Sequence, residues 1–210
     1  LPVWVRERGL QQIGSASKVP QDEMGKNHPY KPGFAFESGL SNILNIPVKG
    51  ILCYQGESNA QEVERVREYA ALTRLMVVDY RVKWKQPELP FYFVQLSSID
   101  TLKYKGQLWP SFRDEQRIIQ DILPHSGMAV CSDIGLRDDV HPRNKKVVGE
   151  RLARWALNQE YLLNIIPAGP LPLKAVYRKG KLIIQFRFAG KELSTSDGSE
   201  LRGFSDATSN

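Results

Sequence analysis

Three short apolar runs alternate with helical patterns in the middle of the chain, and this alternation limits the fold more than any other feature. The runs cover 50–54, 91–96 and 127–131. Each is free of charged residues, as expected for a strand that is covered on both faces in a parallel sheet. The helical patterns over 59–84 and 111–123 suit right-handed crossovers between such strands. We therefore expect an α/β fold with a parallel sheet. If the three strands lie in sequential order, the strand over 91–96 separates Cys53 from Cys131.

Hydroxyl side chains mark the predicted starts of both crossover helices. Ser58 and Gln61 have the spacing of a capping box, and Ser111 precedes the second helical pattern. Two further helices are expected over 36–44 and over 145–160, because apolar residues recur there at helical spacing.

The pattern changes near the end of the chain. After the Pro-Ala-Gly-Pro segment at 167–170, two strand-like runs over 175–178 and 181–187 flank Lys179 and Gly180, which predicts a β-hairpin. A lone hairpin buries too little to form a core of its own. We therefore expect two domains, an α/β domain over 1–165 and the beginning of a β-sandwich-like accessory domain over 166–210.

Composition excludes several classes of function. The net charge of +6 comes from 29 basic and 23 acidic residues that are mixed along the chain, so we expect no nucleic-acid partner. No apolar run approaches the roughly 20 residues that span a bilayer, so no membrane partner is expected. Cys53 and Cys131 lie in separate apolar runs, and the three histidines have no metal-ligand spacing. We expect no disulfide, no metal and no cofactor.

A polar turn follows the first predicted strand and is the first candidate site. It contains Gln55, Gly56, Glu57, Ser58 and Asn59. Ligands bind at the carboxyl ends of strands in open parallel sheets, so we expect this turn to form one wall of a site. The amide groups could donate hydrogen bonds to an oxyanion. The carboxylate could act as a general acid or base, although binding the backbone amides of the loop suits it better.

A polar loop follows the third predicted strand and contains the most suggestive histidine. His141 comes shortly after Asp138 and Asp139. A carboxylate beside an imidazole fixes its tautomer and stabilises the imidazolium that forms when the ring accepts a proton. The alternative interpretation is an exposed histidine in a charged surface loop.

Ser58 allows a second catalytic hypothesis. The segment from Gly56 to Ala60 resembles the G-x-S-x-G elbow of serine esterases and lies between a predicted strand and a predicted helix. The competing interpretation is that the Ser58 hydroxyl caps the following helix. Ser15 and Ser17 lie in a Gly-Ser-Ala-Ser segment that is more typical of a loop.

Three blocks of this sequence resemble the sialate O-acetylesterases and related carbohydrate acetylesterases of the SGNH hydrolase superfamily. They are YQGESNA at 54–60, LPFYFVQL at 89–96 and DVHPRNKKVVGERLA at 139–153. The resemblance covers nearly the whole chain. It implies a flavodoxin-like, three-layer α/β/α fold and hydrolysis of O-acetyl esters on sugars, with 9-O-acetylated sialic acid as the expected substrate. It also implies a periplasmic or secreted location.

The resemblance assigns roles to residues already singled out. In the family a serine attacks the acetyl carbonyl and a histidine accepts its proton, a role that carries over to His141. The superfamily spacing D-x-x-H points to Asp138 as the acid partner, whereas the nearer family block points to Asp139. Residues 55–59 carry over as the substrate and oxyanion wall. Cys53 departs from the family, which usually has Trp there.

The nucleophile is the main departure from the family pattern. The family's serine lies in a G-x-S-N block after an earlier strand, and in this sequence no such block follows a predicted strand that precedes the run over 50–54. We expect the chain to correspond to the C-terminal part of a longer esterase, to be inactive alone, and to receive its serine from an N-terminal piece or a separate chain. The rival hypotheses are an esterase that uses Ser58 and a non-catalytic carbohydrate-binding domain of the same fold.

Overall fold

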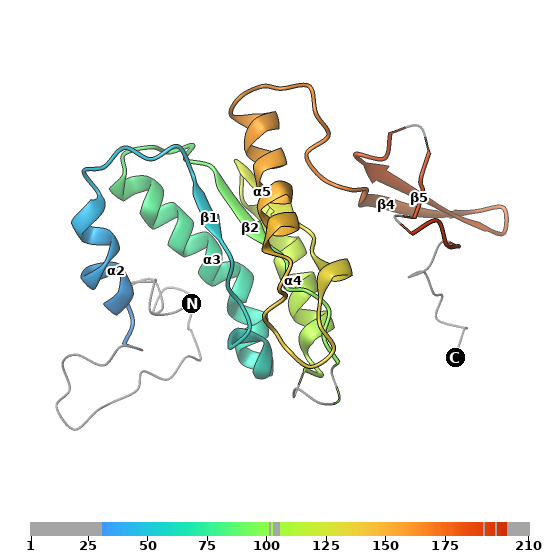
Figure 1. The fold of residues 1–210 in the computed structure, drawn as a ribbon, viewed down its shortest axis with the longest axis horizontal. Coiled ribbons are helices and arrows are strands. Elements are labelled where there is room, and N and C mark those ends of the chain that lie inside the picture. Colours follow the sequence, from blue (N-terminus) through green and yellow to red (C-terminus); the bar gives the residue numbers. More distant parts are fainter. Residues whose placement is uncertain (1–30, 101, 103–105, 191, 196, 201–210) are drawn as a thin grey trace. The chain divides into compact units, whose positions relative to one another are not determined.

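A computed structural model describes residues 31–100, 102, 106–190, 192–195 and 197–200. The chain forms two compact units, residues 1–165 and residues 166–210. The described part of the first unit contains, in chain order, α2 (Phe34–Ser38), η2 (Leu40–Ile43), β1 (Ile51–Cys53), η3 (Asn59–Gln61), α3 (Val63–Lys83), β2 (Phe91–Val94), α4 (Trp109–Ile122), β3 (Ser126–Ala129), η4 (Ser132–Ile134) and α5 (Lys145–Gln159) (Figure 1). The second unit contains β4 (Leu171–Arg178) and β5 (Lys181–Arg187).

The core of the first unit is a three-stranded parallel sheet in the order β1-β2-β3. Ile51 pairs with Phe91, and Phe91 pairs with Ser126, so the strands begin at the same level. The predicted α/β fold is confirmed, and the three strands lie in sequential order. Because all three strands run the same way, the loops that follow them leave from one edge of the sheet.

Helices cover the two faces of the central strand and make the unit three layers thick. Phe91 and Phe93 stack with ring centroids 5.8 Å apart, and both belong to the buried cluster formed with α3 and α4. Tyr92 points to the opposite face, because side chains alternate along a strand. There its ring stacks on Trp155 of α5 at 6.4 Å. The sheet is thus packed between α3 and α4 on one side and α5 on the other.

Trp155 also explains a glycine in β3. Its Nε1 donates a hydrogen bond to the carbonyl oxygen of Met128, at 3.0 Å. A Cβ atom at Gly127 would overlap the Trp155 ring. The indole can lie flat on the strand only because Gly127 has no side chain.

The first strand is less covered than predicted. We expected it to be buried on both faces, but the Leu52 side chain is 64% exposed and Ile51 is only partly buried. β1 lies at the edge of the three-stranded sheet, and α5 packs on β2 and β3. An apolar residue on an edge strand stays open to solvent when no neighbouring element in the described chain covers it.

The predicted capping residues were wrong in both crossover helices. The Ser58 side chain makes no capping hydrogen bond; it precedes the short η3 helix. Glu62 then adopts an extended backbone, with φ −133° and ψ 139°, so α3 starts afresh at Val63. The second helix, α4, begins two residues before Ser111, with a proline in its first turn. Proline suits that position because the first N–H groups of a helix have no partner within it.

The region over 36–44 forms two short helices instead of the single one expected. α2 ends at Ser38 and η2 begins at Leu40, with Gly39 between them. Glycine interrupts a helix easily because its backbone is freer than that of other residues.

The hairpin predicted at the end of the chain is present in the second unit. β4 and β5 pair antiparallel around Lys179 and Gly180, whose φ angles are 51° and 74°. Two consecutive positive φ angles are the signature of a tight two-residue hairpin turn. Nearly all side chains of β4 are exposed. The β-sandwich-like accessory domain remains a prediction.

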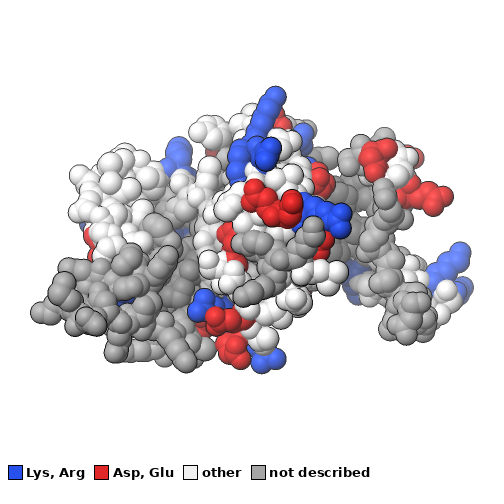
Figure 2. Space-filling view, turned by 60° about the horizontal axis from the view of Figure 1, so that its bottom comes forward, with Lys and Arg blue, Asp and Glu red and all other residues white. Residues whose placement is uncertain are grey.

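Among the described residues that Figure 2 shows, acidic and basic side chains are interspersed, without a broad patch of one sign. Among the described residues, no helix is long and apolar enough to cross a membrane.

Arg81 ties the end of α3 to the amino ends of the strands. Its guanidinium donates to the carbonyl oxygen of Leu89 at 3.0 Å, to that of Pro124 at 2.7 Å and to that of His125 at 3.2 Å. These three residues precede β2 and β3. The side chain is buried, and its bond to Leu89 is buried with it, whereas the bonds to Pro124 and His125 are partly buried.

We expect the Arg81→Met variant to lose about 2–3 kcal/mol in free energy of unfolding, because the buried carbonyl group of Leu89 and the partly buried bonds to Pro124 and His125 lose their donor. Urea denaturation measures this loss. Arg74→Met is the matched control, since Arg74 is exposed on the same helix. Equal stability of the two variants would contradict the structural role of Arg81.

Candidate active site

The turn after β1 is shaped by close packing at Gly56. This residue has a φ of 150°, and a Cβ atom there would lie 2.5 Å from the Phe112 ring. Both the backbone angle and the contact therefore require glycine. The backbone N–H of Asn59 closes the turn by donating to the carbonyl oxygen of Gly56 at 2.8 Å. The turn rests directly on a fully buried aromatic ring of α4.

Side-chain amides connect the two ends of this turn. Gln55 Nε2 donates to Asn59 Oδ1 at 2.9 Å. The hydroxyl of Tyr69, on α3, lies 3.0 Å from the carbonyl oxygen of Gln55 and 3.1 Å from its Oε1. Sequence reasoning found Gln55 and Asn59 but missed Tyr69. Its position on the apolar face of a helix gave no sign that its hydroxyl reaches the turn.

Glu57 and Ser58 lie in the same turn with fewer contacts. The Glu57 side chain is half-buried and binds no backbone amide in the described structure, so the expected pinning role is not observed. Ser58 is exposed, and its hydroxyl makes no hydrogen bond to an imidazole within the described residues. The local strand-turn-helix setting of an elbow is present, but no base is positioned to activate this serine.

Buried neighbours hold His141 in a solvent-facing position. Val140 and Pro142, on either side of it, are both buried, and Val140 belongs to the core cluster of the first unit. The His141 side chain itself is 77% exposed. Two apolar anchors thus fix the backbone while the imidazole points outward.

Asp139 is the carboxylate that contacts this imidazole. Its Oδ1 accepts the backbone N–H of His141 at 2.9 Å and lies 3.1 Å from His141 Nδ1. The hydrogen bond from the backbone N–H, followed by that from the ring, lowers the pKa of the Asp139 carboxyl. Asp138 is exposed and makes no hydrogen bond to His141 in the described structure. The pair therefore has the geometry of an oriented general base.

The histidine loop and the polar turn lie at the same edge of the sheet. The turn follows β1 and the loop follows β3, and these strands are parallel members of one sheet. Lys145, the first residue of α5, places its Nζ 4.5 Å from the centroid of the Tyr54 ring. This cation–π contact joins the start of the turn to the segment just after His141. Burial, reinforced by the Glu57 charge, raises the pKa of Tyr54 to about 12.

Hydrogen bonds also brace the loops that follow β2 and β3. Ser98 Oγ donates to the carbonyl oxygen of Ser132 at 2.5 Å. The backbone N–H of Asp100 donates to the carbonyl oxygen of Arg137 at 2.9 Å, and the Arg137 guanidinium returns a bond to the Asp100 carboxylate at 3.2 Å. These contacts tie together the two loops on the carboxyl side of β2 and β3.

Arg151 fixes the end of β3 from the side of α5. Its guanidinium forms a two-pronged pair with the Asp133 carboxylate, at 2.5 and 2.6 Å, and donates to the carbonyl oxygen of Val130 at 2.6 Å. The hydrogen bond from Arg151 lowers the pKa of Asp133. Burial raises the pKa of the neighbouring Cys131 thiol. Sequence reasoning missed this ion pair because its members are 18 positions apart.

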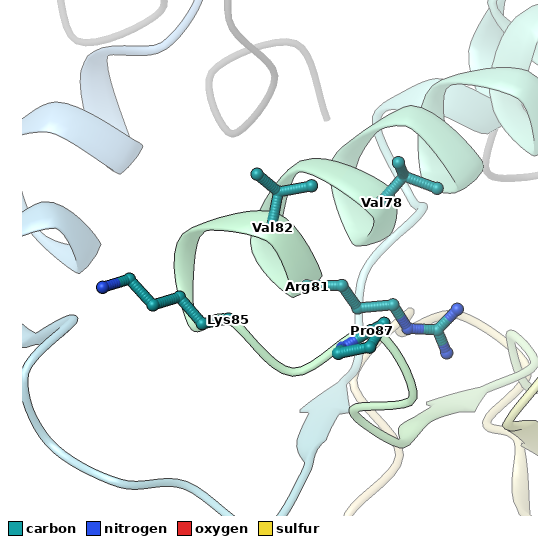
Figure 3. Close-up of a pocket in the computed structure, with 5 residues that line it drawn as sticks. All are labelled: Val78, Arg81, Val82, Lys85 and Pro87. Atoms are coloured by element: carbon teal, nitrogen blue, oxygen red, sulfur yellow. The ribbon is translucent and has the colours of Figure 1, made fainter.

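A hollow of about 320 Å³ lies elsewhere in the unit (Figure 3). It is lined by Val78, Arg81, Val82, Lys85 and Pro87, at the end of α3. Because Arg81 binds the residues that precede β2 and β3, this hollow lies toward the amino edge of the sheet, away from His141. Among the described residues, no cluster of three or more His, Cys, Asp or Glu side chains could hold a metal.

Comparisons with known proteins identify the family of this chain. A family model described as "Carbohydrate esterase, sialic acid-specific acetylesterase" matches residues 34–158. The sialate O-acetylesterase of Homo sapiens is 28% identical over 193 residues, which cover 83% of this chain and 36% of that protein. The sialate O-acetylesterase of Rattus norvegicus is 32% identical over 149 residues, which cover 63% of this chain and 27% of that protein.

A solved structure of a carbohydrate acetylesterase is similar to this chain in fold. The crystal structure of a carbohydrate acetylesterase from Xanthomonas citri superposes with a TM-score of 0.74 at 28% identity, and covers 90% of this chain and 40% of that one. The chain spans about a third of the length of the curated relatives it matches. Since the family model matches more than half of the sequence, the chain belongs to the carbohydrate esterase family of sialic acid-specific acetylesterases.

Proposed function

We propose that this chain carries the general base and part of the substrate wall of an enzyme that hydrolyses O-acetyl esters on carbohydrates. The observation that carries the proposal is the contact between Asp139 and His141 at the sheet edge that also holds the turn over 55–59. Family membership supplies the reaction class. We also propose a mechanism, an origin for the nucleophile and an identity for the sugar.

The proposed mechanism is acyl transfer through a serine. The serine hydroxyl attacks the acetyl carbonyl while His141 Nε2 accepts its proton, and Asp139 at Nδ1 stabilises the imidazolium. Amide donors of Gln55, Gly56 and Asn59 stabilise the negative oxygen of the tetrahedral intermediate. The sugar leaves as its alcohol with the proton from His141. Water then attacks the acetyl-enzyme in the same way and releases acetate.

The nucleophile is proposed to come from outside the described residues. Ser58 lacks a base, and Ser15 and Ser17 lie outside the part of the chain that the structure describes. The exposed Leu52 on edge strand β1 offers a place where a further strand could extend the sheet. We propose that a segment or separate fragment with the family's serine docks along this edge. The chain without it is expected to be inactive.

The sugar is proposed to be an O-acetylated sialic acid, with the ester at position 9. The names of the human and rat relatives support sialic acid as the sugar, and the matched segments cover 36% and 27% of those proteins. Position 9 follows from the family resemblance. Acetate release from 9-O-acetylated sialic acid, measured beside release from an acetylated xylose, tests it. A periplasmic or secreted location is proposed on the same basis.

The His141→Asn variant tests the general base. In the active enzyme assembled from this chain and its nucleophile segment, we expect kcat to fall at least about 10,000-fold, because no group remains to accept the serine proton. Acetate release measures the rate. His125→Asn is the matched control, since His125 is half-exposed beside Glu88 and lies before β3, at the other edge of the sheet. Equal rates for wild type and His141→Asn would refute the role.

The choice between the two acid partners has its own test. We expect Asp139→Asn to lower kcat about 1,000-fold or more, because the amide favours the wrong imidazole tautomer. Asp138→Asn should change kcat less than about threefold, since Asp138 makes no contact with the ring. Each variant is the control for the other. The reverse order of effects would assign the role to Asp138.

A serine-hydrolase probe distinguishes the two nucleophiles. We expect the probe to label the assembled enzyme at another serine and to leave Ser58 unlabelled, because no imidazole among the described residues binds the Ser58 hydroxyl. Mass spectrometry of the labelled peptide identifies the site. Labelling at Ser58 would favour the elbow hypothesis. Sugar binding without any acetate release from the assembled protein would favour a non-catalytic carbohydrate-binding domain.

A further inference from the structure

A buried phenol lies beneath the polar turn, and the proposed mechanism does not yet use it. Tyr69 is only 3% exposed and projects from the first half of α3. Its ring packs against Phe112 with centroids 4.4 Å apart. Phe112 is the same ring that excludes a side chain at Gly56. The two aromatic rings thus form the floor on which the turn rests.

The hydroxyl of Tyr69 reaches one residue of the turn at two points. It lies 3.0 Å from the backbone carbonyl oxygen of Gln55 and 3.1 Å from the side-chain Oε1. The single phenol O–H is shared between these two acceptor oxygens. Burial raises the pKa of Tyr69 well above its ordinary value, so the hydroxyl keeps its proton. A single fixed donor therefore holds the backbone and the amide of Gln55 together.

The remaining bonds of Gln55 define where its amide points. Gln55 Nε2 uses one N–H to donate to Asn59 Oδ1 at 2.9 Å, and Asn59 is itself buried. A primary amide carries two N–H donors. The second one has no partner within the described chain, and the Gln55 side chain is only half-buried. The chain Tyr69–Gln55–Asn59 thus leaves one oriented donor at the catalytic edge.

We propose that Tyr69 is a positioning residue that orients the Gln55 amide toward the substrate oxygen. The inference rests on the proposed function, in which the turn stabilises the negative oxygen of the intermediate. A preorganised donor is effective because it needs no rearrangement as charge develops. Without the phenol hydroxyl, the Gln55 amide would lose the contact at its Oε1 and could rotate away. Tyr69 contributes to the rate through Gln55 and does not touch the substrate.

The Tyr69→Phe variant removes one oxygen and keeps the ring that packs on Phe112. In the active assembled enzyme we expect kcat to fall of order tenfold, less than the roughly 100-fold that loss of an oxyanion donor typically costs, with KM changed less than twofold. Tyr92→Phe is the matched control. Tyr92 is also buried, but its hydroxyl binds the Glu160 carboxylate at 3.0 Å on the opposite face of the sheet. Its removal should lower Tm without lowering kcat.

A double-mutant cycle with Gln55→Ala separates positioning from a general structural effect. If Tyr69 acts through Gln55, adding Tyr69→Phe to Gln55→Ala should leave kcat unchanged. The inference would be overturned if the losses in kcat multiply in the double variant. A normal kcat in Tyr69→Phe or in Gln55→Ala would also overturn it. Failure of the proposed function is a different result, in which His141→Asn keeps full activity or the assembled wild type releases no acetate.

Discussion

The parallel pairing of β1, β2 and β3 is the constraint on which the rest of the structure depends. It sends the three following loops out from one edge, so residues 55–59 and His141 lie at the same edge of the sheet although more than 80 positions separate them in the chain. Side chains then secure the arrangement locally. Phe112 supports the turn at Gly56, and buried Val140 anchors the histidine loop. The Lys145 contact with Tyr54 bridges the two. The proposed site therefore depends first on the parallel direction of the strands and second on side-chain contacts.

The site combines rigid support with an exposed reactive group. Gln55 is held from below by a buried phenol and from the side by Asn59, whereas His141 is mostly open to solvent and contacts only Asp139 through its ring within the described residues. A rigidly held amide together with an exposed imidazole suits the proposed acyl transfer. The oxyanion donors must be preorganised, whereas the base must be accessible to the nucleophile and the leaving group.

Sequence reasoning worked where the signal was local. The apolar runs predicted all three strands, because a strand of a parallel sheet needs only a short uninterrupted stretch of apolar residues. The same holds for the hairpin turn at Lys179 and Gly180, where loop length and glycine suffice.

Other features depended on distant partners. The exposure of Leu52 depends on what lies beside β1. The Tyr69 hydroxyl binds a residue 14 positions away, and the Arg81 guanidinium binds one more than 40 positions away. The predicted cap at Ser58 failed because the extended backbone of Glu62 separates η3 from α3.

The central claim is that the turn and the histidine loop form one catalytic cleft. A crystal structure of the assembled enzyme with a phosphonate analogue of the acetyl-transfer intermediate tests it most directly. The account predicts that the Gln55 amide and the His141 imidazole both lie within hydrogen-bonding distance of the same bound phosphonate group. A phosphonate that contacts one of these side chains while the other points to a separate surface would contradict it.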